Sequence, residues 1–139
     1  MLPEYRRGCP ADLSAVEEIQ RQAPQAAHWD PRDYLSHELW VAADGGAIAG
    51  FLVLRRLAPD ECELLNLAVA PASRRKRIAS GLFRAAVTNF RGNVFLEVRA
   101  SNQEALTFYK YLGFQEFSIR RDYYSSPPES AIVMKFHSC

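Results

Sequence analysis

The chain has 139 residues, which suits one domain spanning 1–139 and leaves no room for two. Hydrophobic residues make up 48% of it, so we expect a packed globular fold rather than disorder. The formal net charge is +1, so no global field favours nucleic acid or an acidic membrane, and any anion site must be a local cluster.

The cysteines and the N-terminal segment indicate the compartment. Cys9, Cys62 and Cys139 form no CxxC pair, lack the spacing of metal ligands and are odd in number, which favours reduced thiols and no bound metal. Residues 1–10 contain no apolar core of a signal peptide, and no apolar run reaches membrane-spanning length. We therefore expect a cytoplasmic protein.

The N-terminal part predicts two helices, with room for an edge strand near Tyr5. Asp12 is placed to cap the first helix. Its apolar face consists of Leu13, Val16 and Ile19. Residues 22–30 predict a loop, and Pro31 suits the first turn of a short second helix that extends to Leu39.

Three strands follow, at residues 40–43, 47–57 and 61–69. Asp44-Gly45-Gly46 is a hairpin signal, and Ala58-Pro59-Asp60 turns the chain again. Short turns between consecutive strands favour antiparallel pairing, so we expect a meander.

The pattern then changes to a helical period. Apolar residues three and four apart predict an amphipathic helix, namely Ala79, Leu82, Phe83, Ala86, Val87 and Phe90. Gly92-Asn93 ends it before a short strand at 94–98. Ser101 and Glu104 form a capping box for the next helix, which stops at Gly113. Strands at 114–121 and 131–136, joined by a Ser- and Pro-rich loop, complete an α/β fold: a mixed, mostly antiparallel central sheet with helices on both faces.

Residues 69–82 contain a concentrated cationic segment. A strand ends there, and a helix begins beside Arg74, Arg75, Lys76 and Arg77. Backbone N–H groups at the helix start and the positive end of its dipole add to these charges, so the segment suits a phosphate or pyrophosphate. The alternative is a solvated basic turn.

Glu97 lies within a short apolar strand. Alternation places Leu96 and Val98 on one face, and Glu97 with Phe95 and Arg99 on the other. A carboxylate in a buried strand requires a partner or a function. One interpretation is a salt bridge with Arg99 or another cation, and the other is a general base of raised pKa.

Tyr109 lies on the apolar face of the helix that follows Asn102. An aromatic residue there packs in the core or acts in catalysis, and a buried phenol is expected to find a hydrogen-bond partner. Both interpretations stay open from the residues alone.

These features occur together and in order, and the combination resembles the GNAT superfamily of N-acetyltransferases over about residues 61–134. The segments that carry the likeness are 65–69 (LNLAV), 96–102 (LEVRASN), 108–114 (FYKYLGF) and 119–124 (IRRDYY). The segment 96–102 is typical of the RimI branch, the ribosomal-protein-alanine N-acetyltransferases, whereas 109–114 is general to the superfamily. His28-Trp29-Asp30 looks like the Pro-Trp-Ser segment of that branch.

The resemblance implies a GNAT fold, acetyl-CoA as the acetyl donor and an amine as the acceptor. The strand at 67–69 splays from its neighbour at a bulge, so that its backbone binds the pantetheine arm and polarises the thioester. The segment 75–80 wraps the pyrophosphate, Asn102 contacts coenzyme A, Glu97 is the base and Tyr109 the acid. The implied donor-binding residues are Leu67, Ala68, Val69, Arg74, Arg75, Lys76, Arg77, Ile78, Ala79, Ser80 and Asn102.

Two positions depart from the family pattern. The phosphate loop reads Gln/Arg-x-x-Gly-x-Gly/Ala, and here Arg74 and Ala79 fit while Arg77 replaces the first glycine. We expect Arg77 to adopt helical geometry and to keep its N–H, so that donor binding survives. The RimI branch tends to carry Glu-Asp-Ala after its last loop, where this chain has Glu129-Ser130-Ala131, so the acceptor differs if that Asp holds the peptide.

The expected function is transfer of acetyl to a protein N-terminus, preferably the alanine of a ribosomal protein. Trp29, Tyr123 and Tyr124 are the expected acceptor contacts, in loops at 28–30 and 121–130. Alternatively, Trp29 plugs the core and the tyrosines cover a sheet edge. Only one of Arg120 and Arg121 faces the acceptor cleft, because side chains alternate.

Other functions remain open. One alternative is an enzyme that acetylates a small amine or another protein N-terminus. Another is a non-catalytic acyl-CoA-binding module. Glu97 and Tyr109 speak against the non-catalytic module. Nucleic-acid binding is disfavoured because the cations cluster at one helix start and the net charge is small.

Overall fold

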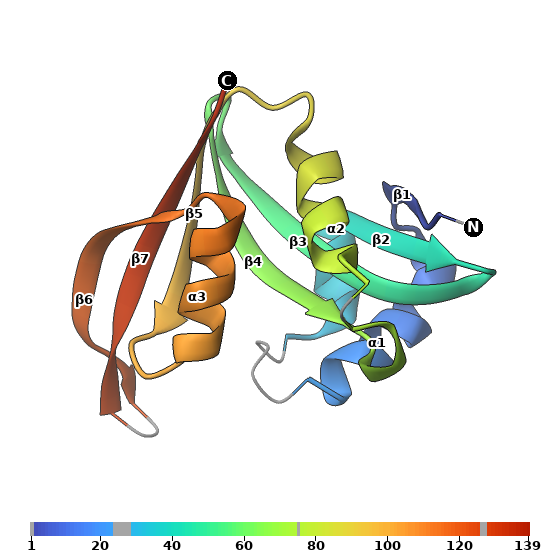
Figure 1. Ribbon diagram of the computed structural model, residues 1–139, viewed down its shortest axis with the longest axis horizontal. Helices are drawn as coiled ribbons and strands as arrows, with labels where there is room; N and C mark the ends of the chain where they lie inside the picture. Colours follow the sequence, from blue (N-terminus) through green and yellow to red (C-terminus); the bar gives the residue numbers. More distant parts are fainter. Residues whose placement is uncertain (1, 24–28, 75, 126–127) are drawn as a thin grey trace. The chain divides into compact units, whose positions relative to one another are not determined.

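The computed structural model describes residues 2–23, 29–74, 76–125 and 128–139 (Figure 1). Its elements are β1 (Glu4–Arg7), η1 (Pro10–Asp12), α1 (Leu13–Arg21), η2 (Pro31–Ser36), β2 (Glu38–Asp44), β3 (Ala47–Ala58), β4 (Glu61–Val69), η3 (Pro71–Ser73), α2 (Ile78–Val87), β5 (Gly92–Arg99), α3 (Gln103–Leu112), β6 (Gln115–Ser125) and β7 (Pro128–Ser138). Within these ranges the strands form one sheet of order β1-β2-β3-β4-β5-β7-β6. Strands β4 and β5 pair in parallel, whereas β1–β2, β2–β3, β5–β7 and β6–β7 pair antiparallel. The predicted mixed, mostly antiparallel sheet is confirmed.

The chain divides into two compact units. Unit 1 comprises residues 1–56 and 64–90, and unit 2 comprises residues 57–63 and 91–139. The division crosses β4. Glu61–Glu63 pair with Asn93–Phe95 of β5 inside unit 2, and the remainder of β4 belongs to unit 1.

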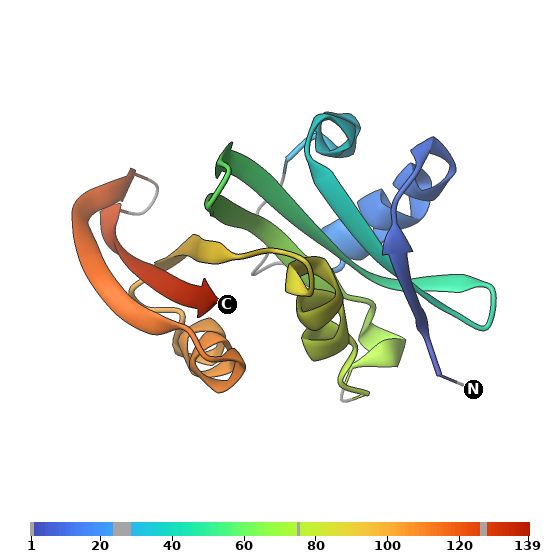
Figure 2. The same ribbon diagram turned by 90° about the horizontal axis from the view of Figure 1, so that it is seen from above.

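In unit 1, strand β3 is buried on both faces, which explains why its residues are almost continuously apolar. Phe51 and Val53 belong to a core with Val16 and Ile19 of α1. Gly50 lies on the opposite face, where a Cβ would come within 3.3 Å of Ile78 and Leu82 of α2. Helices α1 and α2 therefore cover opposite sides of these strands, as Figure 2 shows.

In unit 2, helix α3 covers one face of the β5–β7 pair. The buried residues of that face are Val94, Leu96, Val98, Ile132 and Met134. Phe114, directly after α3, packs on Phe136 with 5.5 Å between ring centroids. The other face of the same strands has no helix from the described part of unit 2, and it carries charged and aromatic side chains.

Several predicted elements are confirmed. A strand at Tyr5, the first helix, the strand at 61–69 and the stop of α3 at Gly113 all occur. Among the described helices, none is both long and apolar enough to cross a membrane.

Other boundaries are wrong for local reasons. The second helix is only the 3-10 turn η2, because Leu39 enters β2 and fills the core of unit 1. Helix α2 ends at Val87, so Phe90 is outside it and Gly92-Asn93 begins β5 instead of ending the helix. The predicted loop at 121–130 is largely strand, since β6 runs to Ser125 and β7 starts at Pro128.

Asp12 does not cap α1 with its side chain, contrary to the prediction. Its carboxylate instead accepts the backbone N–H of Cys9 at 2.9 Å and two hydrogen bonds from Arg6, at 2.8 and 3.0 Å. The bonds from Arg6 lower the pKa of this buried carboxyl to about 2. The interaction joins strand β1 to the start of α1.

Replacing Asp12 with Asn removes a charged partner of Arg6, so we expect the free energy of unfolding to fall by about 1–2 kcal/mol at neutral pH. Because the pKa is depressed in the folded state, this contribution is complete above pH ~4 and disappears as the pH falls toward ~2. The difference between wild type and variant in urea denaturation should therefore vanish in acid. The exposed Asp33→Asn is the control, and an equal loss there would contradict the assignment.

Candidate functional site

The last residues of β4 have an unusual backbone environment. The N–H of Ala70 donates to the carbonyl of Ala49 in β3 at 2.7 Å. Because the backbone N–H and C=O groups of successive residues point to opposite edges of a strand, those of Leu67 and Val69 point away from β3. On that other edge, Leu67 N–H donates to the Asn66 side chain at 3.0 Å, and the Val69 carbonyl accepts from Arg74 at 3.4 Å. The backbone groups of Leu67 and Val69 on this edge are therefore hydrogen-bonded by the nearby side chains of Asn66 and Arg74.

Asn66 is anchored by a buried polar network. Its Nδ2 donates to the Tyr34 hydroxyl at 3.1 Å and to Gln20 Oε1 at 3.2 Å. Tyr34 also donates to Gln20, whose Nε2 in turn donates to the backbone carbonyl of Trp29 at 2.6 Å. The network ties the end of β4 to α1, η2 and the segment around Trp29.

Trp29 is anchored through its backbone carbonyl, which accepts from Gln20. The side chain is 51% exposed, so the interpretation that it plugs the core is wrong. Of the predicted His28-Trp29-Asp30 segment, His28 lies outside the described residues. Asp30 caps η2 by accepting the Arg32 N–H and also forms an ion pair with the Arg32 side chain.

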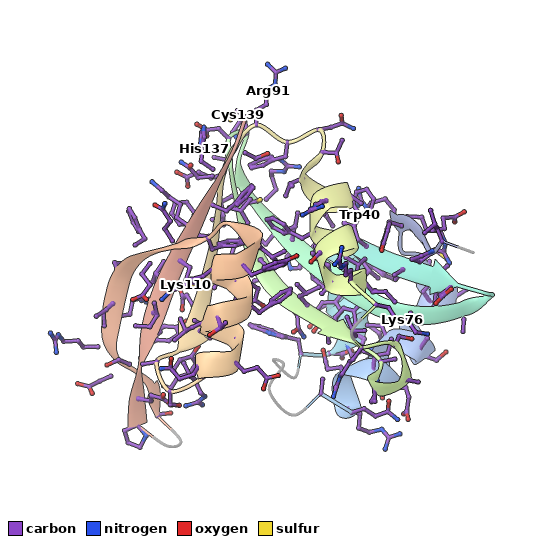
Figure 3. The ribbon with its side chains drawn as sticks, viewed as in Figure 1. Trp40, Lys76, Arg91, Lys110, His137 and Cys139 are labelled. Carbon is purple, nitrogen blue, oxygen red and sulfur yellow. The ribbon has the colours of Figure 1, made fainter. Side chains whose placement is uncertain are left out.

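The cationic segment lies between η3 and α2. Arg74, Lys76 and Arg77 are exposed, Ile78 is buried, and Arg75 lies outside the described residues. Figure 3 shows Lys76 beside the start of α2. Ala79 and Ser80 form the first turn of this helix, and the Gly81 N–H donates to the Arg77 carbonyl at 3.0 Å.

Arg77 is in the left-handed conformation, with φ 59° and ψ 25°, at the N-cap of α2. The expectation of helical geometry is therefore wrong. A glycine adopts a left-handed backbone without cost, whereas any residue with a Cβ is strained there. The backbone path that a glycine allows is thus retained with an arginine.

Replacing Arg77 with Gly should relieve that strain. Gly and Ala variants remove the same charge, and we expect the Gly variant to exceed the Ala variant by about 1 kcal/mol in free energy of unfolding. Thermal and urea denaturation of the two proteins measure the difference. An Ala variant as stable as the Gly variant would mean that Arg77 is not left-handed in solution.

Glu97 lies on the face of unit 2 that none of its described helices covers. The residues on this face of the strands are Phe95, Glu97, Arg99, Phe117, Arg120, Tyr123, Tyr124, Glu129, Val133, Lys135 and the fully buried Ala131. The Glu97 carboxylate is 21% exposed and accepts from Arg120 at 2.8 Å. The predicted salt bridge with another cation is confirmed, and Arg120 is the arginine that faces Glu97.

Arg99 makes a different ion pair. Its Nη1 lies 3.3 Å from Glu129 Oε2, and its guanidinium carbon lies 4.1 Å from the centre of the Tyr124 ring. Glu129 also accepts the Ser101 N–H at 2.6 Å, and the hydrogen bonds from Ser101 lower the pKa of the Glu129 carboxyl. Glu129 of the divergent Glu-Ser-Ala run therefore holds the turn that leads into α3.

Tyr109 belongs to the opposite face. Its ring packs edge-on against Phe114, with 5.6 Å between centroids, on the side that α3 covers. Burial raises the pKa of the Tyr109 hydroxyl to about 12. Glu97 and Tyr109 therefore do not lie on the same face of the sheet in unit 2.

Asn102, and not Ser101, is the N-cap of α3. Its Oδ1 accepts the Ala105 N–H at 3.1 Å, because the turn at Ala100 and Ser101 makes Asn102 the last residue with non-helical backbone before the helix. The predicted capping box is therefore wrong. The cap uses the oxygen of the side-chain amide and leaves its N–H donors oriented by the same bond.

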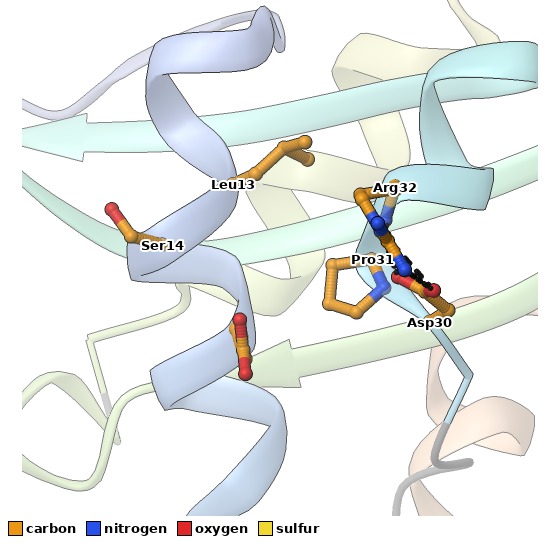
Figure 4. Close-up of a pocket in the computed structure, with 6 residues that line it drawn as sticks. Leu13, Ser14, Asp30, Pro31 and Arg32 are labelled. Atoms are coloured by element: carbon orange, nitrogen blue, oxygen red, sulfur yellow. Dashed lines mark hydrogen bonds and ion pairs between the residues drawn. The ribbon is translucent and has the colours of Figure 1, made fainter.

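The structure also contains an open pocket that the sequence did not indicate. Leu13, Ser14 and Glu17 of α1 line it on one side, and Asp30, Pro31 and Arg32 on the other (Figure 4). It includes none of the residues predicted to bind the donor or to act in catalysis.

Comparison with known proteins identifies the class. Residues 9–114 match the sequence profile of the acetyltransferase (GNAT) family, so the chain belongs to this family and is an acyltransferase. It is 33% identical over 134 residues to the [ribosomal protein bS18]-alanine N-acetyltransferase of Escherichia coli K12, covering 88% of this chain and 89% of that protein.

Solved structures share the fold. Ard1 from Thermoplasma volcanium superposes with a TM-score of 0.88 at 27% identity, covering 100% of this chain and 99% of Ard1. A GNAT family acetyltransferase from Elizabethkingia anophelis, solved with acetyl-CoA bound, gives a TM-score of 0.73 at 17% identity, with 98% of each chain covered. The resemblance to the GNAT superfamily and its ribosomal-protein-alanine branch is confirmed.

Proposed function

We propose that this protein is an acetyl-CoA-dependent N-acetyltransferase that acetylates the N-terminal α-amine of a protein, preferably an alanine-starting ribosomal protein. The carrying observation is Glu97, a half-buried carboxylate on a polar and aromatic face of a sheet, in a chain one-third identical to a ribosomal-protein-alanine acetyltransferase. The profile match spans both units, which supports their acting as one domain over residues 1–139.

The donor-binding residues come mainly from unit 1. The N–H of Leu67 and the carbonyl of Val69 hydrogen-bond to the side chains of Asn66 and Arg74. An extended pantetheine arm can replace these side chains as the hydrogen-bond partner of the strand. Arg77 precedes α2 in the left-handed conformation that a glycine would adopt, and the free N–H groups at the start of α2 suit a phosphate. The exposed Arg74 and Lys76 add positive charge. Ala68 is 7% exposed and packs in the core of unit 1, so its contribution is through the backbone.

Glu97 is the general base of this proposal. An α-amine has a pKa near ~8 and is largely protonated at neutral pH, whereas only the neutral form attacks a thioester. Glu97, directly or through a water molecule, accepts the proton. The freed lone pair adds to the acetyl carbonyl, and collapse of the tetrahedral intermediate breaks the carbon–sulfur bond.

Tyr109 is the general acid. The departing thiolate of coenzyme A needs a proton, and a phenol whose pKa is about 12 remains protonated across the physiological range. Asn102, oriented by its cap bond to Ala105, directs its amide N–H toward coenzyme A. Proximity of the bound acetyl and amine supplies much of the remaining acceleration.

The acceptor contacts are aromatic. Trp29 and Tyr123 are 51% and 45% exposed, and Tyr124 packs edge-on against Tyr123 at 5.1 Å. Flat, rigid side chains of this kind suit a peptide backbone. An alanine-starting ribosomal acceptor places the enzyme in the cytoplasm, where Cys9, Cys62 and Cys139 remain thiols.

Acetyl transfer from labelled acetyl-CoA to a panel of acceptors tests this function. Alanine-starting peptides should react faster than peptides with a blocked N-terminus and a free lysine, and faster than polyamines. Glu97→Gln should lower turnover about a hundredfold or more, because its amide cannot accept the proton, while calorimetry finds acetyl-CoA binding unchanged.

Preference for a polyamine or a lysine side chain would remove the acceptor assignment and retain the acetyltransferase. Wild-type turnover by Glu97→Gln would make Glu97 a structural residue.

Tyr109→Phe isolates the acid role, because it removes one hydroxyl and keeps the ring against Phe114. We expect the single-turnover rate to fall about tenfold to a hundredfold, with the melting temperature little changed. Since the pKa is raised to about 12, wild-type activity should show no loss from Tyr109 ionisation below pH ~11. An unchanged rate would assign the proton to water, and a collapse in stability would assign Tyr109 to the core.

A further inference from the structure

We propose that Arg120 is a specificity-determining residue that occupies Glu97 in place of the acceptor ammonium until the acceptor displaces it. The inference rests on the proposed function, because it assumes that Glu97 receives an incoming amine. It adds that the free enzyme already holds a tethered cation on its base, with which every acceptor must compete.

The contacts of Arg120 are those of a cation in a binding site. Its Nη1 lies 2.8 Å from Glu97 Oε1, and its guanidinium carbon lies 4.2 Å from the centre of the Tyr123 ring. A carboxylate and an aromatic face are also the groups that recognise an ammonium ion. Arg120 therefore occupies the position that a charged amine would take on Glu97.

The two partners differ in mobility. The Arg120 side chain is 52% exposed, whereas that of Glu97 is 21% exposed. An arginine with half of its surface in water can swing outward at small cost, but a carboxylate in the middle of β5 cannot follow it. Displacement consequently moves Arg120 and leaves the base in place.

The backbone of β6 is distorted in a way that builds this arrangement. Residues three apart on a regular strand point to opposite faces, so Arg120 and Tyr123 should not meet. The β6–β7 register shifts between Arg120 and Tyr124, and Asp122 within this bulge has φ 54°. A left-handed non-glycine residue is costly, and the distortion is what brings Tyr123 over Arg120.

Tyr123 links both ends of the pair. A hydrogen bond with Glu97 raises the pKa of the Tyr123 phenol, and the positive charge of Arg120 opposes that shift. Glu63 adds negative potential at the same tyrosine. When Arg120 leaves Glu97, the ring and this potential can retain the guanidinium nearby, so the exchange replaces one monocation with another on the carboxylate.

The exchange makes the site selective for amines that arrive charged. A guanidinium cannot give up its proton at physiological pH, so the resting pair is inert. An α-ammonium that replaces it can transfer one proton from its nitrogen to Glu97 Oε1, which leaves a neutral amine and a neutral carboxyl. A neutral, weakly basic amine gains no ion pair and does not displace Arg120.

Steady-state kinetics with an alanine-starting peptide tests the proposal in Arg120→Met. Because the pair is partly exposed, removing the competitor should lower the peptide KM about two- to fivefold, with kcat and the KM for acetyl-CoA changed by less than about twofold. Added methylguanidinium should inhibit this variant competitively against the peptide, and wild type much less, because the tethered group already fills the site.

Three further proteins serve as controls. Arg120→Lys keeps the cation and should resemble wild type, and Arg120→Gln repeats the charge removal if the Met variant folds poorly. Arg91→Met removes an equal charge from the exposed residue just before β5, at the other end of that strand from Arg99 (Figure 3), and should leave all parameters unchanged.

A higher peptide KM in Arg120→Met would overturn the proposal, because Arg120 would then bind the acceptor. A lower kcat at constant KM that Lys restores would overturn it too, since Arg120 would then only position Glu97. Either result requires acetyl transfer by wild type, so the proposed function survives it. No transfer by wild type to any peptide would overturn the proposed function and this proposal together.

Discussion

The two faces of strand β5 are the constraint on which the chemistry of unit 2 depends. Leu96 and Val98 are buried beneath α3, and the period of two then directs Glu97 to the face that has no helix from the described part of this unit. Arg120, Tyr123 and Tyr124 gather on that face around Glu97 and Arg99. Tyr109 of α3 lies on the opposite side, so the proposed base and the proposed acid belong to different faces of the sheet.

In unit 1 the comparable constraint is the polar network of Gln20, Tyr34 and Asn66. Each of these side chains is buried, and each satisfies another, so the network costs little in lost hydration. It orients Asn66 toward the N–H of Leu67 and holds the carbonyl of Trp29. The proposed pantetheine edge and the proposed acceptor aromatic residue are thereby supported from a single buried cluster.

Two described non-glycine residues with positive φ lie where the backbone departs from regular helix or strand geometry. Arg77 keeps the glycine path at the start of α2, and Asp122 reverses the facing of side chains within β6. Both conformations carry a local energetic cost that neighbouring structure must offset. One lies in the proposed phosphate loop and the other beside the proposed base, so strain in this fold coincides with the candidate site.

The sequence by itself determined the family, the order of the main elements and the faces of β5, because these depend on local periodicity and on motifs such as residues 96–102. It also gave a salt bridge to a cation as one of two interpretations of Glu97, since a carboxylate in a buried strand needs a partner or a function. Only the tertiary structure decided that this partner is Arg120, that Arg99 pairs with Glu129, and that Asn102 caps α3. The two ion pairs depend on strand register and on the bulge with left-handed backbone at Asp122. Such features arise from pairing between distant segments, which no local pattern of residues specifies.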